Sequence, residues 1–388
     1  RPAPPDRLRP EHRGGIRISE ADLRPHSFRG ETAAELVFVN GRFAAGLSSV
    51  NDLPQGVFAE SLAAALENRK ALLEGHLGRY ADFETRGFVA WNTAFLQEGA
   101  FVFVPAGIAL PNPIHLLWVS VGEREPFAAH PRALVLLEKG AAATVVESYV
   151  SASDGAFLTN AVTEARVEEG ASLTHLRLQA EGEKAYHVGN VQAHQEGGSR
   201  FRSLTFTFGA ALSRCEIGSV LDGERAWCEL DGLYVGRGDQ LIDNHTLIHH
   251  ASARCDSREL YKGILTDRAR GVFSGKIVVR QDAQQTDAKQ TNQALLLSGS
   301  ATVHAKPQLE IFADDVKCTH GATVGRLDED AVFYLRARGI DEGDARNLLT
   351  FAFASDLTER IEFAPLRRRA EDLLAARLPQ GAKIRGDL

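Results

Sequence analysis

A thiol and an imidazole stand two residues apart in the stretch DDVKCTHGATVG at 314–325. In an extended strand, Cys318 and His320 point to the same face, with their Cα atoms roughly 7 Å apart. Each side chain could give one bond to an iron ion or an iron–sulfur cluster, and such clusters are held by about four ligands. These two residues therefore predict half of a metal site, which a partner would complete.

A second group of metal-binding residue types lies in DNHTLIHHASARC at 243–255. In a strand, His245 and His249 would share one face, while His250 would point to the other. These histidines and Cys255 could bind a metal, but histidines in stacked strands more often bond to neighbouring strands, and we favour that structural role. The adjacent carboxylates Asp314 and Asp315 would face opposite sides of a strand, so we interpret them as turn residues rather than an acid/base pair.

Familiar catalytic motifs are not found in the sequence. It contains no GxSxG, HExxH or dinucleotide-binding glycine pattern. The nearest approach to a phosphate loop, GVFSGKI at 271–277, lacks the required glycine spacing and the Ser or Thr after Lys276. We therefore do not expect the chain to hydrolyse ATP.

The overall composition is that of an ordinary soluble protein: 388 residues, 44% hydrophobic and 24% charged. A net charge of −7 and the lack of a basic stripe argue against nucleic acid or an anionic membrane as the main partner. Apolar runs such as FVFVPAGIAL at 101–110 are interrupted by proline or glycine and are too short to span a membrane. Four scattered cysteines without a CxxC pair predict no disulfide framework and favour a reducing, cytoplasmic location.

The first residues, RPAPPDRLRPEHRGG, lack the apolar core of a secretory signal. The sequence contains no methionine, and so no initiator. We expect the sequence to be less than the complete translation product.

Four regions are expected along the chain. Residues 1–30 have no periodicity and predict a loose N-terminal segment. Residues 31–93 predict an α/β cap, with a strand at 36–39 and a helix at 60–77. A β region follows at 94–327, and a helical C-terminal domain at 328–388.

The β region is marked by glycine turns that recur with alternating side chains after them. Gly140, Gly170 and Gly197 are separated by 30 and 27 residues, with almost no helical periodicity between them. Repeats of this size favour the stacked coils of a parallel β-helix. A β-sandwich built from regular hairpins is the competing interpretation.

The C-terminal region has helical periodicity. Asp341 and Asp344 resemble a capping box before a helix at 345–361, and Pro365 stands where the next helix, at 366–378, could begin. That last helix carries one apolar stripe, made of Leu366, Ala370, Leu373, Leu374 and Leu378.

Several long segments resemble the SufB/SufD family of the SUF iron–sulfur assembly machinery, and its SufD branch in particular. The resemblance is carried by GVFSGKIVVRQDAQQTDAKQTNQALLLS (271–298), KPQLEIFADDVKCTHGATVG (306–325), AVFYLRARGI (331–340), NTAFLQEGAFVFVPAGIALPNPIHLL (92–117), LVFVNGRF (36–43) and DNHTLIHH (243–250). It covers most of residues 31–365. Cys318-Thr319-His320 has the SufD form of the element, whereas the basic, aromatic N-terminal helical segment usual in SufD is not visible before residue 30.

The resemblance implies a right-handed parallel β-helix that pairs with SufB, and C-terminal helices that bind the ATPase SufC. It implies a scaffold rather than an enzyme, with a transient iron–sulfur cluster shared with the partner at Cys318 and His320, of which the histidine is the more essential. The alternatives are a SufB-like homodimeric scaffold, a purely structural homodimer, or a β-helix carbohydrate-active enzyme, which would need a row of carboxylates that does not stand out.

Overall fold

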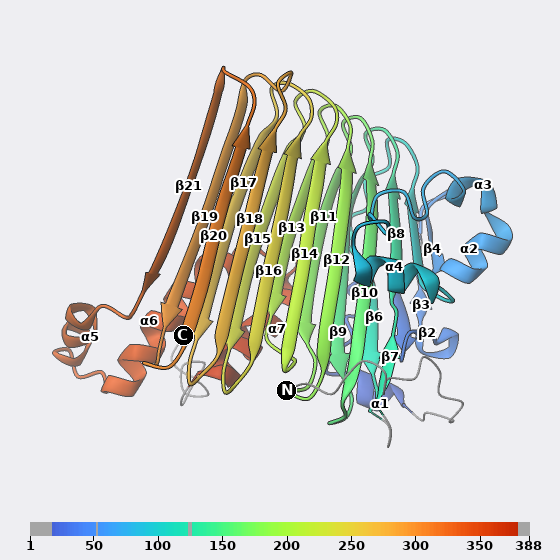
Figure 1. The fold of residues 1–388 in the computed structure, drawn as a ribbon. Coiled ribbons are helices and arrows are strands. Elements are labelled where there is room, and N and C mark those ends of the chain that lie inside the picture. Colours follow the sequence, from blue (N-terminus) through green and yellow to red (C-terminus); the bar gives the residue numbers. More distant parts are fainter. Residues whose placement is uncertain (1–17, 52, 123–125, 379–388) are drawn as a thin grey trace.

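The computed structural model describes residues 18–51, 53–122 and 126–378, and a long solenoid of stacked strands dominates it (Figure 1). From β8 onward, successive strands alternate between two sheets, so that each coil gives one strand to each sheet. The pairings between coils are parallel, for example β14 with β16 and β19 with β21. The predicted parallel β-helix is confirmed, and the alternative of a hairpin-built sandwich is wrong.

The two sheets have 11 and 10 strands. The first sheet runs in the order β2 (Arg42–Phe43), β1 (Ala34–Val39), β6 (Ile114–Ser120), β9 (Ala142–Ser151), β11 (Ser172–Ala180), β13 (Arg200–Thr207), β15 (Trp227–Gly236), β17 (Asp256–Leu265), β19 (Thr286–Leu296) and β21 (Val316–Gly325), with β3 (Ser49–Val50) beside β1. The second runs in the order β20 (Thr302–Ile311), β18 (Arg270–Val279), β16 (Leu241–His250), β14 (Leu212–Leu221), β12 (Tyr186–Gln195), β10 (Phe157–Val167), β8 (Arg132–Leu137), β5 (Ala100–Val104) and β4 (Phe58–Ser61), with β7 (Phe127–Ala129) beside β10. Strands β20 and β21 thus form the last coil and the edges of their sheets.

At one corner of the solenoid, each successive coil has a residue with a left-handed backbone conformation. Gly140, Gly170 and Gly198 have φ near +67°, and Arg225, Arg254 and Gln285 continue the series in later coils. The backbone N–H of each donates to a carbonyl in the next coil, as Gly140 does to Glu169 (2.9 Å). The glycine spacing therefore did mark the coil period, but the third turn residue is Gly198 rather than the expected Gly197.

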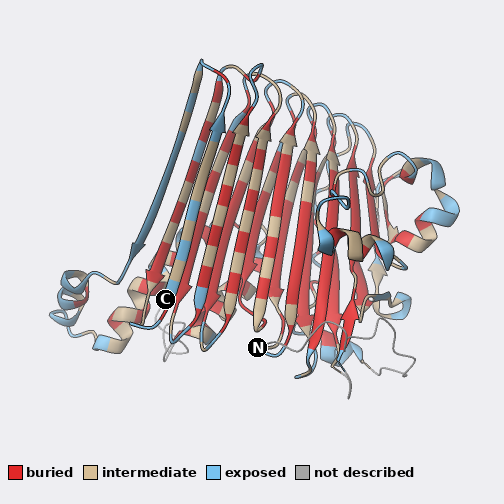
Figure 2. Cartoon of the chain, in the orientation of Figure 1, coloured by how far each residue is buried: buried red, intermediate tan, exposed pale blue. Residues whose placement is uncertain are grey.

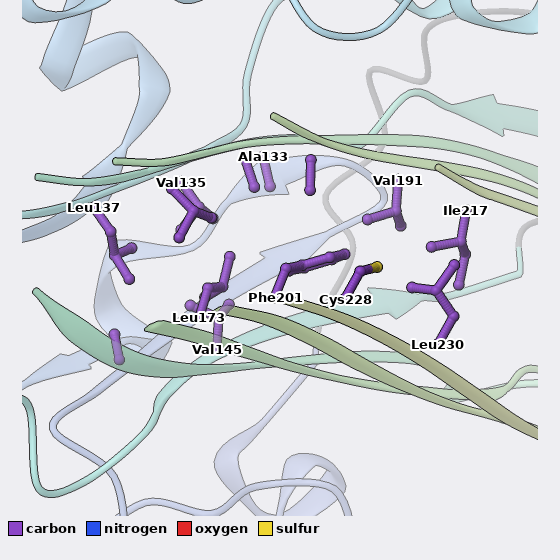
Figure 3. Close-up of a cluster of buried hydrophobic side chains, with 14 of the residues drawn as sticks. Ala133, Val135, Leu137, Val145, Leu173, Val191, Phe201, Ile217, Cys228 and Leu230 are labelled. Atoms are coloured by element: carbon purple, nitrogen blue, oxygen red, sulfur yellow. The ribbon is translucent and has the colours of Figure 1, made fainter. Parts of the chain in front are cut away.

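The interior between the two sheets holds the main hydrophobic core (Figure 3). Val145, Leu173 and Phe201 come from the first sheet, and Val191 and Ile217 from the second. Alternate residues of each strand point inward because side chains alternate across a strand. This period of two decides which residues of the last coil face the interior.

The N-terminal region differs from expectation in two places. Residues 1–30 were expected to be loose, and residues 1–17 of that segment lie outside the described residues. Residues 18–30 are ordered by the helix α1 (Glu20–Leu23), whose Leu23 is buried, and by a hydrogen bond that Ser27 Oγ donates to Glu35 (2.6 Å). The helix expected at 60–77 is wrong, because β4 takes its start and Arg69 separates α2 (Leu62–Asn68) from α3 (Lys70–Leu73). Arg69 leaves helical geometry and places its guanidinium over Phe58, with an ion pair to Glu60.

The remaining helices are α4 (Gly87–Ala94), the single turn η2 (Ala45–Leu47), α5 (Glu329–Arg336), α6 (Glu342–Thr358) and α7 (Ala364–Arg377). The N-cap of α6 is Asp341, which accepts a bond from Gly343 N, and Pro365 lies in the first turn of α7, as expected. The buried stripe of α7, with Leu366, Ala370 and Leu374, packs on the outer face of the first sheet against residues such as Leu178 and Phe206. Helices α6 and α7 thus share a core with the solenoid, whereas α5 lies beyond its last coil (Figure 1).

Candidate metal half-site at the open end of the solenoid

Cys318 and His320 lie on β21, in the last coil of the solenoid. In the register of β19 with β21, Cys318 is opposite Ala288 and His320 is opposite Gln290. Ala288 and Gln290 are buried and face the interior, so the same alternation turns Cys318 and His320 inward as well. The predicted common face is therefore the inward face of the last coil.

This inward face is uncovered, because no further coil follows among the described residues. The residues of β21 are exposed or half-buried, whereas the inward-facing residues of β19 in the preceding coil are buried (Figure 2). Cys318 is half-buried and packs against the main core, whereas His320 is exposed. A thiol and an imidazole thus stand at the open mouth of the solenoid.

The local environment of Cys318 favours the neutral thiol. Burial raises its pKa, and the nearby Asp287 carboxylate raises it further, while a hydrogen bond with the Ala288 backbone opposes the shift. A metal ion would have to displace the proton in order to bind the thiolate. This side chain is not an activated nucleophile on its own.

A complete metal site is not present in the part of the chain that the structure describes, where no group of three or more His, Cys, Asp or Glu side chains could hold an ion. The other three cysteines, Cys215, Cys228 and Cys255, are buried, and burial raises the pKa of each. Two side chains at one open end are fewer than the about four ligands that hold an iron–sulfur cluster.

The histidine cluster at 243–255 is engaged in ordinary polar contacts. His245 Nε2 lies 2.8 Å from Asp243 Oδ1, and Arg280 donates to His249 Nε2 (2.8 Å), both on the outer face of β16. His250 points inward, and its Nε2 lies 2.9 Å from Ser257 Oγ. The alternation expected for these histidines is found.

Asp314 and Asp315 lie in the bend before β21, where the Asp315 carbonyl accepts a hydrogen bond from Gln285 N (2.6 Å).

Behind His320 lies a buried polar column that the sequence analysis did not single out. Glu259, Gln290 and His320 occupy the same register position in three successive coils. Gln290 Nε2 donates to Glu259 Oε2 (2.9 Å), and Thr246 Oγ1 donates to Glu259 Oε1 (2.5 Å). The coil spacing of 31 and 30 residues, combined with alternation along each strand, was the signal that could have found this column.

The C-terminal helices offer two different surfaces. On α6, Phe351 and Phe353 pack against the solenoid, and Lys262 Nζ bonds to the Phe353 carbonyl (3.0 Å). On α5, Phe333 and Tyr334 are 69% and 56% exposed. Of these four aromatic residues, the pair on α5 is the more exposed, with the Arg338 guanidinium over one face of the Tyr334 ring.

Comparison with known proteins identifies the family. A profile described as the SufBD core domain of SUF system FeS cluster assembly matches residues 119–353, and one for the N-terminal region of SufBD proteins matches residues 31–116. The chain belongs to the SufBD family. The solenoid and the open coil with Cys318 and His320 are thus features of a SufBD protein.

Individual relatives agree with this assignment. An iron–sulfur cluster assembly SufBD family protein of Synechocystis is 36% identical over 89% of this chain and 78% of its own length. The iron–sulfur cluster assembly protein SufD of Escherichia coli is 34% identical over 90% of this chain and 81% of its own. The SufD protein of Bacillus subtilis is 24% identical over 81% and 72%. The family ties the chain to iron–sulfur cluster assembly.

Proposed function

We propose that this SufBD protein is a non-catalytic scaffold subunit of a SufB–SufC–SufD complex, with an iron or cluster site shared with SufB at the open end of the solenoid. The observation that carries the proposal is the inward pair Cys318 and His320 on an uncovered coil. Two ligands cannot hold a cluster alone, so the site needs ligands from the partner. The cluster is the cargo of the assembly rather than a resident cofactor.

The open end also has the properties of a binding surface. Strands β20 and β21 each end a sheet, so each presents one row of backbone donors and acceptors that no strand of the described chain pairs with. Exposed apolar residues lie on these strands, namely Ile311 (38%) on β20 and Val324 (52%) on β21, and Phe312 (63%) directly follows β20. A second solenoid could add its own edge strands here and bury these side chains together with the half-site.

The same unpaired edges keep one alternative open, a SufB-like homodimer in which two copies of this chain pair. Membership in an iron–sulfur assembly family makes a carbohydrate-active enzyme the less favoured alternative.

The ATPase activity of the complex is assigned to SufC, which we place on the C-terminal helices, where Phe333 and Tyr334 are exposed on α5. The acidic, CxxC-free sequence supports a cytoplasmic location; among the described residues, no helix is both long and apolar enough to cross a membrane.

The decisive experiment is reconstitution without oxygen. The purified chain is mixed with its SufB and SufC counterparts, and co-elution, iron and sulfide are measured. We expect a stable three-protein complex that retains iron, and no iron retained by this chain alone. If the chain binds neither SufB nor SufC and elutes only as a homodimer, the proposal is wrong.

A further inference from the structure

Gln290 is buried, and among the described residues one of its polar atoms has no partner. The residue is 0% exposed, and its Oε1 makes no hydrogen bond to any residue that the structure describes. A buried amide oxygen without a donor has lost its hydrogen bonds to water without a replacement, and such atoms call for an explanation. The position of this atom in the fold supplies one.

The orientation of the Gln290 amide is fixed from two sides. Its Nε2 donates to Glu259 Oε2 in the preceding coil (2.9 Å), so the nitrogen is turned away from the last coil. Across the interior, any side chain at position 275 would collide with this amide, and Gly275 leaves the space for it. While Glu259 is ionised, both of its oxygens accept, so the amide nitrogen lies on that side and the oxygen is the atom available to a new donor.

The nearest inward side chain in the next coil is that of His320. Gln290 and His320 are register partners in parallel strands, whose backbones lie about 4.8 Å apart. Inward side chains at paired positions stack on one another along a solenoid. His320 is exposed, and so its ring can turn toward the amide below it.

We propose that Gln290 is a positioning residue for His320: its Oε1 accepts a hydrogen bond from one ring N–H, which leaves the other ring nitrogen unprotonated and directed to the open end. A ligating imidazole commonly donates its second N–H to an acceptor behind it, which fixes the tautomer and the ring orientation. The inference rests on the proposed role of His320 as a ligand. In this arrangement Glu259 holds the Gln290 amide, and Gln290 orients the ring of His320.

The test compares two glutamine variants of the full chain, Gln290→Leu and Gln293→Leu. Gln293 lies three residues further along β19 and faces the other side of the sheet, so it controls for loss of a glutamine from this strand. The ring nitrogens of His320 are observed by ¹⁵N NMR on histidine-labelled protein, with His320→Ala for assignment. We expect Gln290→Leu to change the ratio of the two neutral tautomers by about fivefold, and Gln293→Leu to leave it unchanged.

Gln290→Leu removes a donor from buried Glu259 and could unfold the chain. The substitution is therefore also made in a Glu259→Gln background, where no buried carboxylate loses its donor. An unchanged tautomer ratio in a folded Gln290→Leu chain of either background overturns the inference.

Iron retained by each variant in the complex with SufB and SufC separates this inference from the proposed function. We expect Gln290→Leu to retain less iron than Gln293→Leu. If the tautomer ratio changes but iron does not, Gln290 does not support a ligand, and the inference fails. If His320→Ala also retains normal iron, the proposed ligand role of His320 has failed as well.

Discussion

Arg360 Nη1 lies 2.8 Å from Asp231 Oδ2, and this ion pair joins the chain just beyond α6 to the outer face of β15. The Asp231 side chain is 2% exposed, and Glu229, with its like charge, lies close enough to bond the same guanidinium (3.3 Å). Burial and the charge of Glu229 raise the pKa of Asp231 to about 7, against the opposing effect of Arg360. The C-terminal helices are therefore held to the solenoid by polar as well as apolar contacts.

Arg360→Ala should weaken this attachment, because it leaves buried Asp231 without its cation beside the like charge of Glu229, which keeps its ion pair with Arg202 (3.0 Å). Since the arginine is partly exposed, we expect a loss of about 2 kcal/mol in the free energy of unfolding, below the value for a fully buried pair. Urea denaturation would measure it. Arg268→Ala, which breaks an exposed pair with Asp239, is the control and should leave stability unchanged. Equal effects of the two substitutions would contradict the role given to Arg360.

Glu259 should make stability depend on pH. Burial raises the pKa of this carboxyl group from 4.5 to about 7, so the folded chain holds a proton that the unfolded chain releases between those values. The contribution of Glu259 is therefore present below about pH 4.5 and is lost as the pH rises to about 7, by about 3 kcal/mol. In urea denaturation, the free energy of unfolding should fall less between pH 5 and pH 8 for Glu259→Gln than for the unaltered chain. If the free energy of unfolding changes with pH in the same way for both chains, this prediction is wrong.

The aromatic pair on α5 provides a test of SufC binding that spares the fold. Removing the whole region after residue 327 would uncover the apolar outer face now covered by α6 and α7, including Leu178 and Phe206, so that deletion would lower stability as well as binding. We expect Phe333→Ala combined with Tyr334→Ala to reduce capture of SufC at least tenfold, with an unchanged melting temperature. Phe351→Ala is the matched comparison, since that ring packs on the solenoid, and it should lower the melting temperature. Full SufC capture by the double variant would remove α5 from the proposed interface.

His320→Ala should separate assembly from iron loading. The exposed imidazole contributes little to packing, so the complex with SufB and SufC should form while iron incorporation falls severalfold. Cys318→Ser should have a milder effect, because it keeps the volume of a side chain that packs on the core and whose thiol is held neutral. Iron content and cluster maturation in cells would be compared. Wild-type maturation by His320→Ala would mean that the histidine is structural.

The chain alone should not keep a cluster. Three of its cysteines are buried, and in the part of the chain that the structure describes no group of three or more His, Cys, Asp or Glu side chains could hold an ion. Anaerobic loading with iron and sulfide, followed by gel filtration, should leave no more than traces of bound iron. A stoichiometric brown cluster on the single subunit would show that further ligands exist in this chain.

Much of the fold could be predicted from the sequence, because it depends on short-range patterns. Turn glycines at intervals of nearly 30 residues and alternating side chains predicted stacked coils, and Asp341 and Pro365 marked helix starts that the structure has. The helix at 60–77 failed because pairing of Glu60 with Phe101 in the sheet overrides its helical preference. The third turn was off by one residue because Gly197 and Gly198 are adjacent, and only backbone geometry distinguishes them.

For the candidate site, the sequence by itself determined which residue types stand two apart, and the alternation of a strand then put Cys318 and His320 on one face. Only the tertiary structure decided that this face is the uncovered interior of the last coil, with Gln290 and Glu259 behind His320. The reason is physical: alternation is a property of one strand, whereas neighbours 30 residues apart are set by the register between coils. Where the stack of coils ends decides whether such a pair is buried in the core or open to a partner.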